Sequence, residues 1–489
     1  MADPHGRSDR TTTSAASLPT VIQGGMGVAV SSWRLARAVA GTGQLGVVSG
    51  TALDVVMARR LQDGDDGGHL RRALSHFPVP RMAEQVLARY YRPHGRGAGE
   101  PYAPVPKLSV RPSTRGVELA VVAAFTEVWL AKEGQAGVVG INLLQKIQMA
   151  TAPAVYGSML AGVDYVLMGA GIPAEVPALL DRLARHEAVQ LTLDVDDATK
   201  RYDVGLAPQT MTAGGLPALS RPRFLAVISA DVLAARLARE DATRPDGFVV
   251  EGATAGGHNA PPRARGALTD DGQSLFGPRD AANLERIARI GLPFWLAGGQ
   301  GTPESVVAAR ATGATGVQVG TVFALCAESG LDADLRRAAL RELADQRLDV
   351  RTEPLASPTG FPFKVATLAG TLSDPGLVSR RIRLCDVGYL RTAVEYAPGR
   401  LGYRCPAEPV DVYVRKGGRA EETMGRLCLC NALLAAVGLG QDRPTGYHEP
   451  PLVTLGSDLD GPRRLLHDHP DGWTADDAVA FLLPTAGRR

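Results

Sequence analysis

The chain has 489 residues, of which 45% are hydrophobic, so it can bury one large core and still carry additional segments. Its 53 basic and 51 acidic residues nearly cancel, which excludes the strong positive field expected of a nucleic-acid-binding protein or of one held on an anionic membrane. The sequence shows no signal peptide and no apolar run long enough to span a bilayer. We therefore expect a cytoplasmic protein that acts on a small-molecule substrate, with no nucleic-acid or membrane partner.

The two ends of the chain differ in composition from its middle. Residues 1–18 are polar and lack an apolar run, so we predict a disordered leader there. All five cysteines lie at or after Cys326, and their odd number does not suit the disulfide framework of a secreted protein. This pattern favours a reducing compartment.

Short apolar runs alternate with Ala/Leu/Arg-rich helical patterns from Thr20 onwards, which is typical of βα units in a parallel sheet. The strand candidates are a segment at Val21 and residues 45–48, 138–142, 165–167, 191–193, 224–228, 248–250, 294–297 and 316–319. These are nine candidates for the eight places of a (β/α)8 TIM barrel. We exclude 191–193, because the stretch after it, DDATKRYDVGLAPQTMTAGG, is typical of a hairpin or loop insertion rather than of a crossover helix.

One helix between strands is well delimited by its own sequence, TPESVVAARATG. Thr302 is suited to cap the N-terminus, and Pro303 is suited to the first turn. Glu304 lies near the positive end of the helix, and Gly313 can end it. The last third of the barrel is therefore expected to be regular.

Three regions follow from these patterns. Residues 19–330 are expected to form the barrel. Within them, residues 54–135 are too long for a simple connection between the second and third strands, so we expect an inserted cap of helices and loop beside the active-site mouth, which ends in FTEVWLAKEG. Residues 331–489 begin with the helical stretch DADLRRAALRELADQRL and are expected to form a helical and irregular extension packed on the barrel.

Glycine clusters follow three of the expected strands. The first, IQGGMG at residues 22–27, lets the backbone approach a flat or charged ligand closely, although it is also compatible with an ordinary tight turn. The other two, WLAGGQGTPESVV and GVQVGTVF, follow the last two strands, where barrels commonly bind phosphate through backbone N–H groups and a helix N-terminus. No G-x-G-x-x-G opens a helix, which argues against a dinucleotide fold.

A histidine follows a further glycine pair in the sequence FVVEGATAGGHNAPPR. Gly256 and Gly257 end a strand, and His258 comes directly after them. Catalytic groups project from the carboxyl ends of barrel strands, and an imidazole ordinarily titrates near working pH. His258 is therefore the candidate acid or base.

Taken together, QGGMG, GINLL, EGATAGGH, LAGGQ and GATGVQVGT resemble the nitronate monooxygenase or 2-nitropropane dioxygenase family across residues 20–325. The resemblance implies a TIM barrel that binds FMN, with His258 at the reactive face of the flavin as the catalytic base. The cofactor-binding residues that it implies are Gln23, Gly24, Gly25, Met26, Asn142, Gly256, Gly257, Ala297, Gly298, Gly299, Gln318, Gly320 and Thr321. Of these, Gly298, Gly299, Gly320 and Thr321 are expected to hold the phosphate.

The resemblance implies an FMN-dependent nitronate monooxygenase, which converts alkyl nitronates or nitroalkanes with oxygen to carbonyl compounds and nitrite. Residues 259–263 depart from the shorter members, and the C-terminal motifs LCDVGYLR, GYRCPAEPV and GRLCLCNALLAAVGLGQ are similar to a longer subgroup that includes reductases of polyunsaturated fatty acid and polyketide synthases. One alternative is therefore an NAD(P)H- and FMN-dependent enoyl-acyl-carrier-protein reductase. Another alternative is a flavin-binding assembly subunit of low activity.

Several residues have roles that the sequence leaves open. An acyl carrier protein would need a basic patch, for which the candidates are Arg59, Arg60, Arg71, Arg72, Arg380, Arg381 and Arg383. Four cysteines could supply thiolates to zinc or an iron–sulfur cluster, but their spacing is unlike that of the common motifs, so no metal ligand is assigned and buried core thiols are the simpler interpretation. These are Cys385, Cys405, Cys428 and Cys430. Lys364 and the Asp374-Pro375 turn are expected to border the active site without an assigned chemistry, and a homo-oligomer is compatible with the sequence.

Overall fold

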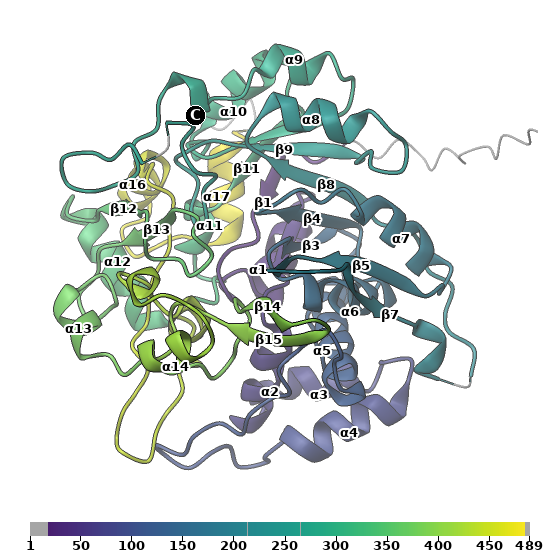
Figure 1. Ribbon diagram of the computed structural model, residues 1–489. Helices are drawn as coiled ribbons and strands as arrows, with labels where there is room; N and C mark the ends of the chain where they lie inside the picture. The colour runs from purple at the N-terminus through teal and green to yellow at the C-terminus, as the bar shows by residue number, and fades with distance from the viewer. Residues whose placement is uncertain (1–17, 213, 265, 485–489) are drawn as a thin grey trace, which may run out of the picture.

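The computed structural model describes residues 18–212, 214–264 and 266–484 (Figure 1). Its centre is a sheet of eight parallel strands in the order β1-β11-β10-β9-β8-β4-β3-β2. These strands are β1 (Val21–Gln23), β2 (Gly46–Ser49), β3 (Val139–Leu144), β4 (Tyr165–Gly169), β8 (Arg223–Ile228), β9 (Gly247–Glu251), β10 (Phe294–Ala297) and β11 (Gly316–Val319). Ile22 pairs with Leu45 in parallel and closes the sheet on itself. The predicted (β/α)8 barrel is confirmed.

The closed sheet has two apolar faces, as its nearly all-apolar strands require. One set of side chains fills the barrel interior and includes Ile22, Val47, Leu167 and Trp295. The alternate set faces outward and packs against the helices. Of the predicted leader 1–18, residues 1–17 lie outside the described part of the chain, and Leu18 packs against the interior cluster.

The helical layer follows the strands in order. The helices up to β11 are α1 (Trp33–Gly41), α2 (Leu53–Gln62), α3 (His69–Leu74), α4 (Pro80–Tyr90), α5 (Thr114–Lys132), α6 (Gln148–Leu160), α7 (Val176–Ala184), α8 (Asp231–Ala238), α9 (Leu284–Ala288) and α10 (Pro303–Ala311). Helix α10 begins as predicted, because Thr302 Oγ1 accepts a hydrogen bond from Ser305 N–H at 3.2 Å. Helices α2, α3, α4 and α5 all lie between β2 and β3, and α5 packs between α1 and α6, with α2, α3 and α4 against it.

The stretch that was excluded from the barrel is a hairpin. Strands β5 (Val189–Leu193) and β7 (Tyr202–Leu206) pair antiparallel outside the barrel sheet. The short strand β6 (Val195–Asp196) lies between them in sequence and pairs with β14 (Thr392–Ala397) of the C-terminal region. The exclusion of residues 191–193 from the eight barrel strands is therefore confirmed.

The chain after β11 crosses the mouth of the barrel and returns to it. Its elements are α11 (Thr321–Ala324), α12 (Ala333–Ala344), β12 (Val350–Glu353), β13 (Phe363–Ala366), α13 (Pro375–Arg380), β14, β15 (Arg400–Arg404), α14 (Val410–Arg415), α15 (Leu429–Ala435), α16 (Asp460–Asp468) and α17 (Ala475–Leu482). Strands β12 and β13 form one antiparallel pair, and β14 and β15 form another. No helix in the described part of the chain is long and apolar enough to cross a membrane.

The last helix of the chain completes the helical ring of the barrel. Helix α17 packs against α1, α10 and α11, in the place where an eighth barrel helix would follow β11. It is drawn in yellow beside β11 and α11 in Figure 1. Trp473 anchors this return: it is 1% exposed, and its indole N–H donates to the Val322 carbonyl at 2.9 Å. Residues 331–484 are thus structurally continuous with the barrel.

We predict that Trp473→Ala lowers the free energy of unfolding by about 3–5 kcal/mol, because it opens a cavity just before α17 and leaves the Val322 carbonyl unpaired. Urea denaturation followed by circular dichroism measures this loss. Val307→Ala on α10 is the control, since Val307 is 70% exposed and its truncation should change stability by less than about 0.5 kcal/mol. Equal effects of the two substitutions would contradict a role of Trp473 in closing the helical ring.

Candidate active site

A pocket of about 1610 Å³, measured to its open mouth, lies at the carboxyl ends of the barrel strands. Loops after β1, β3, β9, β10 and β11 line it, together with segments of the C-terminal region. All of the sequence-predicted site residues line this pocket except Gln23. The glycine clusters that lie far apart in the sequence therefore converge, as expected for a site at this end of a barrel.

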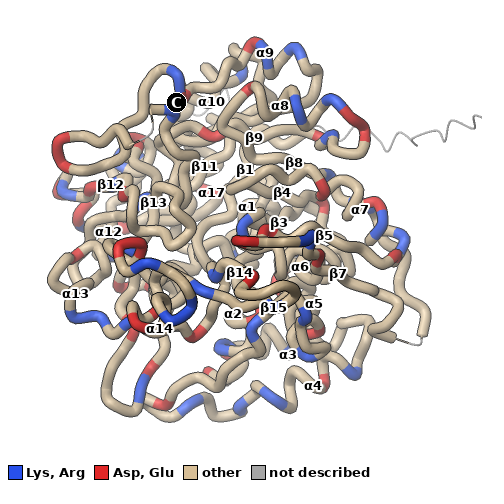
Figure 2. The backbone as a smooth tube through the Cα atoms, viewed as in Figure 1, with Lys and Arg blue, Asp and Glu red and all other residues tan. Residues whose placement is uncertain are grey.

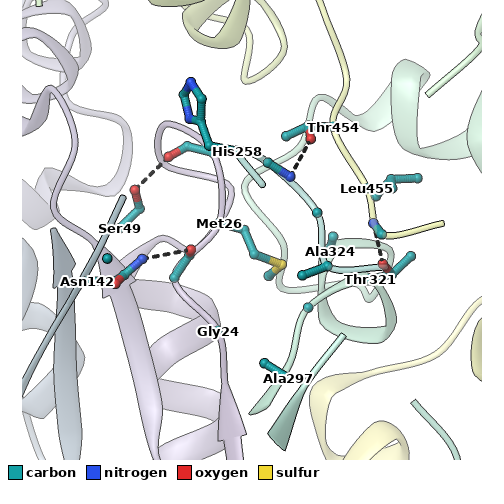
Figure 3. Close-up of a pocket in the computed structure, with 18 of the residues that line it drawn as sticks. Gly24, Met26, Ser49, Asn142, His258, Ala297, Thr321, Ala324, Thr454 and Leu455 are labelled. Carbon is teal, nitrogen blue, oxygen red and sulfur yellow. Dashed lines mark hydrogen bonds between the residues drawn. The ribbon is translucent and has the colours of Figure 1, made fainter. Parts of the chain in front are cut away.

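Two serines fix the glycine loop after β1. Ser31 Oγ donates to the Gly24 carbonyl at 2.8 Å and accepts from Met26 N–H at 2.9 Å. Ser49 Oγ donates to the Gly27 carbonyl at 2.7 Å (Figure 3). These bonds hold the backbone of the loop rigidly beside the pocket.

Gly25 faces Asn142 of β3. The Asn142 amide donates to the Gly25 carbonyl at 3.2 Å. A Cβ added at Gly25 would lie 2.3 Å from the Asn142 Cβ, so no other residue fits without a shift of the backbone. The close approach places both residues on one wall of the pocket, as Figure 3 shows for Asn142 and the neighbouring Gly24.

Gln23 does not line the pocket, although the family resemblance implied that it lies near a flavin. Its side chain is fully buried between β1 and β2. Its amide nitrogen donates to Ser31 Oγ at 2.9 Å, and its amide oxygen accepts from Val47 N–H at 3.0 Å. Gln23 therefore positions the loop that lines the pocket, because a buried amide must satisfy its hydrogen bonds within the protein.

The opposite end of the pocket is rich in unpaired hydrogen-bond donors. In the described part of the chain, the backbone N–H groups of residues 299–301 and of Gly320 and Thr321 donate to no protein acceptor. Gly298 has φ +85°, and a Cβ there would lie 3.0 Å from both Ala255 N and the Gly252 carbonyl oxygen. Such a nest of N–H groups at a helix start binds anions.

Gln318 adds an orphaned acceptor to the same pocket. Its amide oxygen is buried and has no hydrogen-bond partner among the described residues. Buried polar atoms are almost always paired, so an unpaired one in a pocket wall points to a bound molecule as its partner. The pocket thus offers both donors and an acceptor to a polar ligand.

Residues 454–458 form part of the site that sequence reasoning missed. Gly257 N–H donates to Thr454 Oγ1 at 3.0 Å, and Gly456 N–H donates to Thr321 Oγ1 at 2.9 Å (Figure 3). Asp458 lines the pocket beside Gly299 and accepts from Asp460 N–H at 3.1 Å, at the start of α16. The motif VTLGSD carries small polar residues, but nothing in its local pattern shows that it returns to the barrel.

His258 lies at the other end of the drawn site from Ala297 (Figure 3). Its Nε2 is 2.7 Å from Ser357 Oγ, and its ring meets the edge of Phe363 at a centroid distance of 4.8 Å. Burial, and to a smaller degree the positive charge of Lys146, lowers the pKa of His258 to about 4. The expectation of an imidazole that titrates near neutrality is therefore wrong, because desolvation opposes the charged form. His258 is neutral at physiological pH.

Glu251 is a second pocket residue that the sequence reasoning did not single out. It ends β9 and lies opposite Ala297 of β10 in the strand register. Burial raises the pKa of its carboxyl to about 7. The group that changes charge near neutral pH in this pocket is thus Glu251. Its position at the carboxyl end of a barrel strand was the available signal.

Further segments of the C-terminal region complete the wall of the pocket. Tyr389, Leu390, Leu429, Cys430 and Leu433 line it, whereas residues 54–135 supply none of the lining side chains. The expected cap at 54–135 contributes indirectly, since Tyr389 OH donates to the buried Asp54 carboxylate. The position beside the mouth belongs to the C-terminal region.

Lys364 lies next to the site, as expected. It is 3% exposed, and its ammonium group donates to Thr352 Oγ1 and, at 3.3 Å, to Ser457 Oγ. Burial lowers its pKa to about 8. Its neighbour Phe363 lines the pocket, so Lys364 supports the wall from behind.

The carboxyl ends of the strands of a closed parallel barrel are where enzymes of this fold carry their active sites. Residues 218–353 of this chain match the model of the family described as nitronate monooxygenase, which confirms the resemblance drawn from the motifs and relates the chain to a family of oxidoreductases. No curated protein matches the sequence.

The chain is also similar to solved structures at low identity. It shares 16% identity with nitroalkane oxidase from Streptomyces ansochromogenes over 96% of both chains, with a TM-score of 0.43. It shares 12% with the enoyl reductase domain of MlnA from the macrolactin cluster of Bacillus amyloliquefaciens, over 95% of this chain and 93% of that one, with a TM-score of 0.48. FabK from Thermotoga maritima shares 17% over 71% and 70%, with a TM-score of 0.38.

We predict that Gly25→Ala destabilises the protein by about 1–3 kcal/mol, because the added methyl group overlaps Asn142 and forces the loop after β1 to move. Thermal unfolding of the purified variant measures the loss. Gly41→Ala at the end of α1 is the matched control, since a Cβ there meets nothing within 4 Å. A Gly25→Ala variant as stable as the control would show that the contact with Asn142 is not tight.

Proposed function

We propose that this protein is an FMN-dependent oxidoreductase that oxidises alkyl nitronates with molecular oxygen to carbonyl compounds and nitrite. The observation that carries the proposal is a single pocket with two unlike ends. One end offers unpaired backbone N–H groups suited to a phosphate, and the other presents the neutral imidazole of His258. The family match supports the choice of reaction.

The residues of the pocket fit FMN. The N–H groups of Gly301, Gly320 and Thr321 would hold its phosphate, and Gly24 and Gly25 leave room for a flat ring close to the backbone. Asp458 would repel a phosphate placed at Gly299, so its carboxylate is better suited to accept hydrogen bonds from ribityl hydroxyls. When bound, FMN supplies the redox chemistry.

The electrostatics at the other end favour a substrate that is already an anion. With a pKa of about 4, His258 is a weak base and is poorly suited to remove a proton from a neutral nitroalkane. A nitronate has already lost that proton and needs only a hydrogen-bond donor and a nearby cation. The neutral imidazole of His258 can supply the hydrogen-bond donor. The positive charge of Lys146 is close enough to lower the pKa of His258, so it can serve as the nearby cation.

The enoyl-acyl-carrier-protein reductase alternative loses part of its support, because most of the candidate arginines are neutralised within the protein. Arg60 pairs with Glu127, Arg71 with Asp65, Arg72 with Glu133 and Arg381 with Glu449. Arg59 is buried. Figure 2 accordingly shows basic and acidic residues interspersed over the outer helices and loops. These side chains do not form one basic docking face.

We predict that anaerobic stopped-flow mixing with an alkyl nitronate bleaches the flavin of the purified holoprotein, whereas NADH and NADPH reduce it at least about tenfold more slowly. We expect this difference because the His258 end of the pocket offers a hydrogen-bond donor and a nearby positive charge to a small anion. Rapid reduction by NADPH with no response to a nitronate would instead support the reductase alternative.

His258→Ala serves as the control in the same experiment. It should retain FMN, because His258 lies at the end remote from the phosphate-binding groups, and lose about 10²–10³-fold in reduction rate, as expected for the loss of one hydrogen-bond donor. Unchanged reduction with FMN still bound would remove His258 from the mechanism. A flavin that no substrate reduces would favour the assembly subunit.

We predict that KM for a nitronate rises as the pH passes upward through about 7, because Glu251 ionises there and its negative charge opposes the anionic substrate. The Glu251→Gln variant should lose this rise and keep the low KM up to at least about pH 8.5, roughly one to two units beyond the transition. His258 is already neutral above pH 5, so no inflection near 6.5 is expected. Steady-state kinetics from pH 5 to 8.5 measures both effects, and an inflection near 6.5 that disappears in His258→Ala would contradict the assignment.

A further inference from the structure

The segment 357–364, which leads into β13, runs along His258 and fixes its backbone. His258 forms an antiparallel bridge with Phe363. On one side of it the Gly257 carbonyl accepts a hydrogen bond from this segment at 2.9 Å, and on the other side Asn259 N–H donates to it at 3.0 Å. The edge-to-face contact with Phe363 restrains the ring as well. The position of the imidazole is therefore set by the protein before any ligand binds.

The two nitrogen atoms of the His258 ring have different surroundings. Nε2 lies 2.7 Å from the hydroxyl of Ser357, a residue that is fully buried and does not line the pocket. Nδ1 has no hydrogen-bond partner among the described residues and is not enclosed, so it opens onto the pocket that His258 lines. Nδ1 is therefore the nitrogen that can reach a substrate.

The role of Nδ1 depends on which tautomer of the imidazole is present. Burial keeps His258 neutral at physiological pH, so one ring nitrogen carries a proton and the other is bare. Nδ1 is a hydrogen-bond donor to the pocket if Nε2 is bare, and it is an acceptor if Nε2 carries the proton. The hydrogen bond that one ring nitrogen makes fixes the state of the other. The Ser357 hydroxyl thus decides what His258 offers to a substrate.

The Ser357 hydroxyl has one proton and two neighbouring acceptors for it. Its oxygen accepts from Thr359 N–H at 3.2 Å and lies 2.8 Å from Thr359 Oγ1. A bare imidazole nitrogen is a much stronger base than an alcohol oxygen, so the Ser357 proton goes to His258 Nε2 and Thr359 Oγ1 donates to Ser357. The buried hydroxyl then uses its proton and both of its lone pairs, as buried polar groups do.

The backbone around Ser357 is also held in place. The Arg426 guanidinium donates to the Ser357 carbonyl at 2.6 Å and to the Leu355 carbonyl at 3.0 Å. Together with the bond from Thr359 N–H, these contacts leave the hydroxyl of Ser357 one favourable orientation. A donor that is oriented in advance costs no reorganisation when a substrate arrives.

We propose that Ser357 is a positioning residue that holds His258 in the tautomer with its proton on Nδ1. The pocket then presents a preformed hydrogen-bond donor. The consequence for the substrate rests on the proposed function: Nδ1–H can donate to an anionic oxygen of a nitronate. It cannot take the α-proton of a neutral nitroalkane, because a protonated Nδ1 has no free lone pair. Ser357 would thus favour the anion without touching it.

The test is ¹⁵N nuclear magnetic resonance of the full-length protein as purified, with labelled histidine rings. The spectrum of His258→Gln identifies the signals of His258. We expect a protonated Nδ1 and a bare Nε2, and a proton on Nε2 would overturn the proposal. Ser357→Ala should redistribute the proton between the two nitrogens, whereas an unchanged Nδ1–H in this variant would deny Ser357 its role.

Ser158→Ala is the matched control. Ser158 on α6 is equally buried, and its hydroxyl donates to the Val155 carbonyl at 2.7 Å. Its loss should leave the tautomer of His258 unchanged. If Ser357→Ala fails to fold, Thr359→Val decides the matter, because it keeps the Ser357 hydroxyl and should keep the proton on Nδ1. A change of tautomer in Thr359→Val would show that the Ser357 proton had pointed to Thr359, and would overturn the proposal.

Stopped-flow reduction by an alkyl nitronate separates this inference from the proposed function. Ser357→Ala should slow flavin reduction by about tenfold, less than His258→Ala does, because part of the imidazole still carries its proton on Nδ1. A protonated Nδ1 with no reduction by any nitronate would support the tautomer and overturn the proposed function. Reduction by a nitronate with the proton on Nε2 would overturn the tautomer alone.

Discussion

The seam between β1 and β2, where the sheet closes on itself to form the barrel, is the constraint on which the barrel and its pocket both depend. β1 has only three residues, and its backbone bonds to the other side of the seam are those of Gln23 N–H and the Val21 carbonyl with Leu45, at 2.9 and 3.1 Å. The buried amide of Gln23 adds a bond to Val47 N–H on one side and holds Ser31 on the other. The Gln23 side chain therefore stabilises both the closure of the barrel and the conformation of the loop that lines the pocket.

The same dependence extends to the end of the chain. The loops after β9 and β11 obtain their hydrogen-bond partners from Thr454 and Gly456, and the helical ring obtains its last member from α17. The barrel is thus not a unit to which an extension was added, because its pocket and its outer layer are both incomplete without residues 454–482. Loops that bind ligands need such support, since their own local contacts are too few to hold one geometry.

The sequence predicted the barrel well because strand positions are encoded locally. Buried parallel strands must be apolar on both faces, and glycine is required where the backbone turns sharply or approaches another segment, as at Gly25 and Gly298. The hairpin at β5 and β7 was separable from the barrel because its polar connection cannot form a crossover helix. These signals need no knowledge of distant parts of the chain.

The roles of Gln23, His258 and Glu251 were not predictable in the same way. Whether a polar side chain faces a ligand, satisfies a neighbouring strand or loses its charge depends on what packs around it. Ser357 and Phe363, which hold the His258 ring, come from about a hundred residues downstream. The position of a motif can be predicted from local pattern, whereas its protonation depends on burial by segments that the pattern does not identify.

Burial shifts the pKa values of His258 and Glu251 in the pocket in opposite directions, and this opposition decides the charge of the site. Desolvation disfavours whichever form is charged, so it lowers the pKa of His258 and raises that of Glu251. Between about pH 4 and pH 7 both groups are therefore uncharged, so an ionised Glu251 does not oppose the positive charge of Lys146. A site in this state attracts an anion and offers little driving force for proton abstraction, which is the reason for proposing a preformed nitronate as the substrate in place of its neutral parent acid.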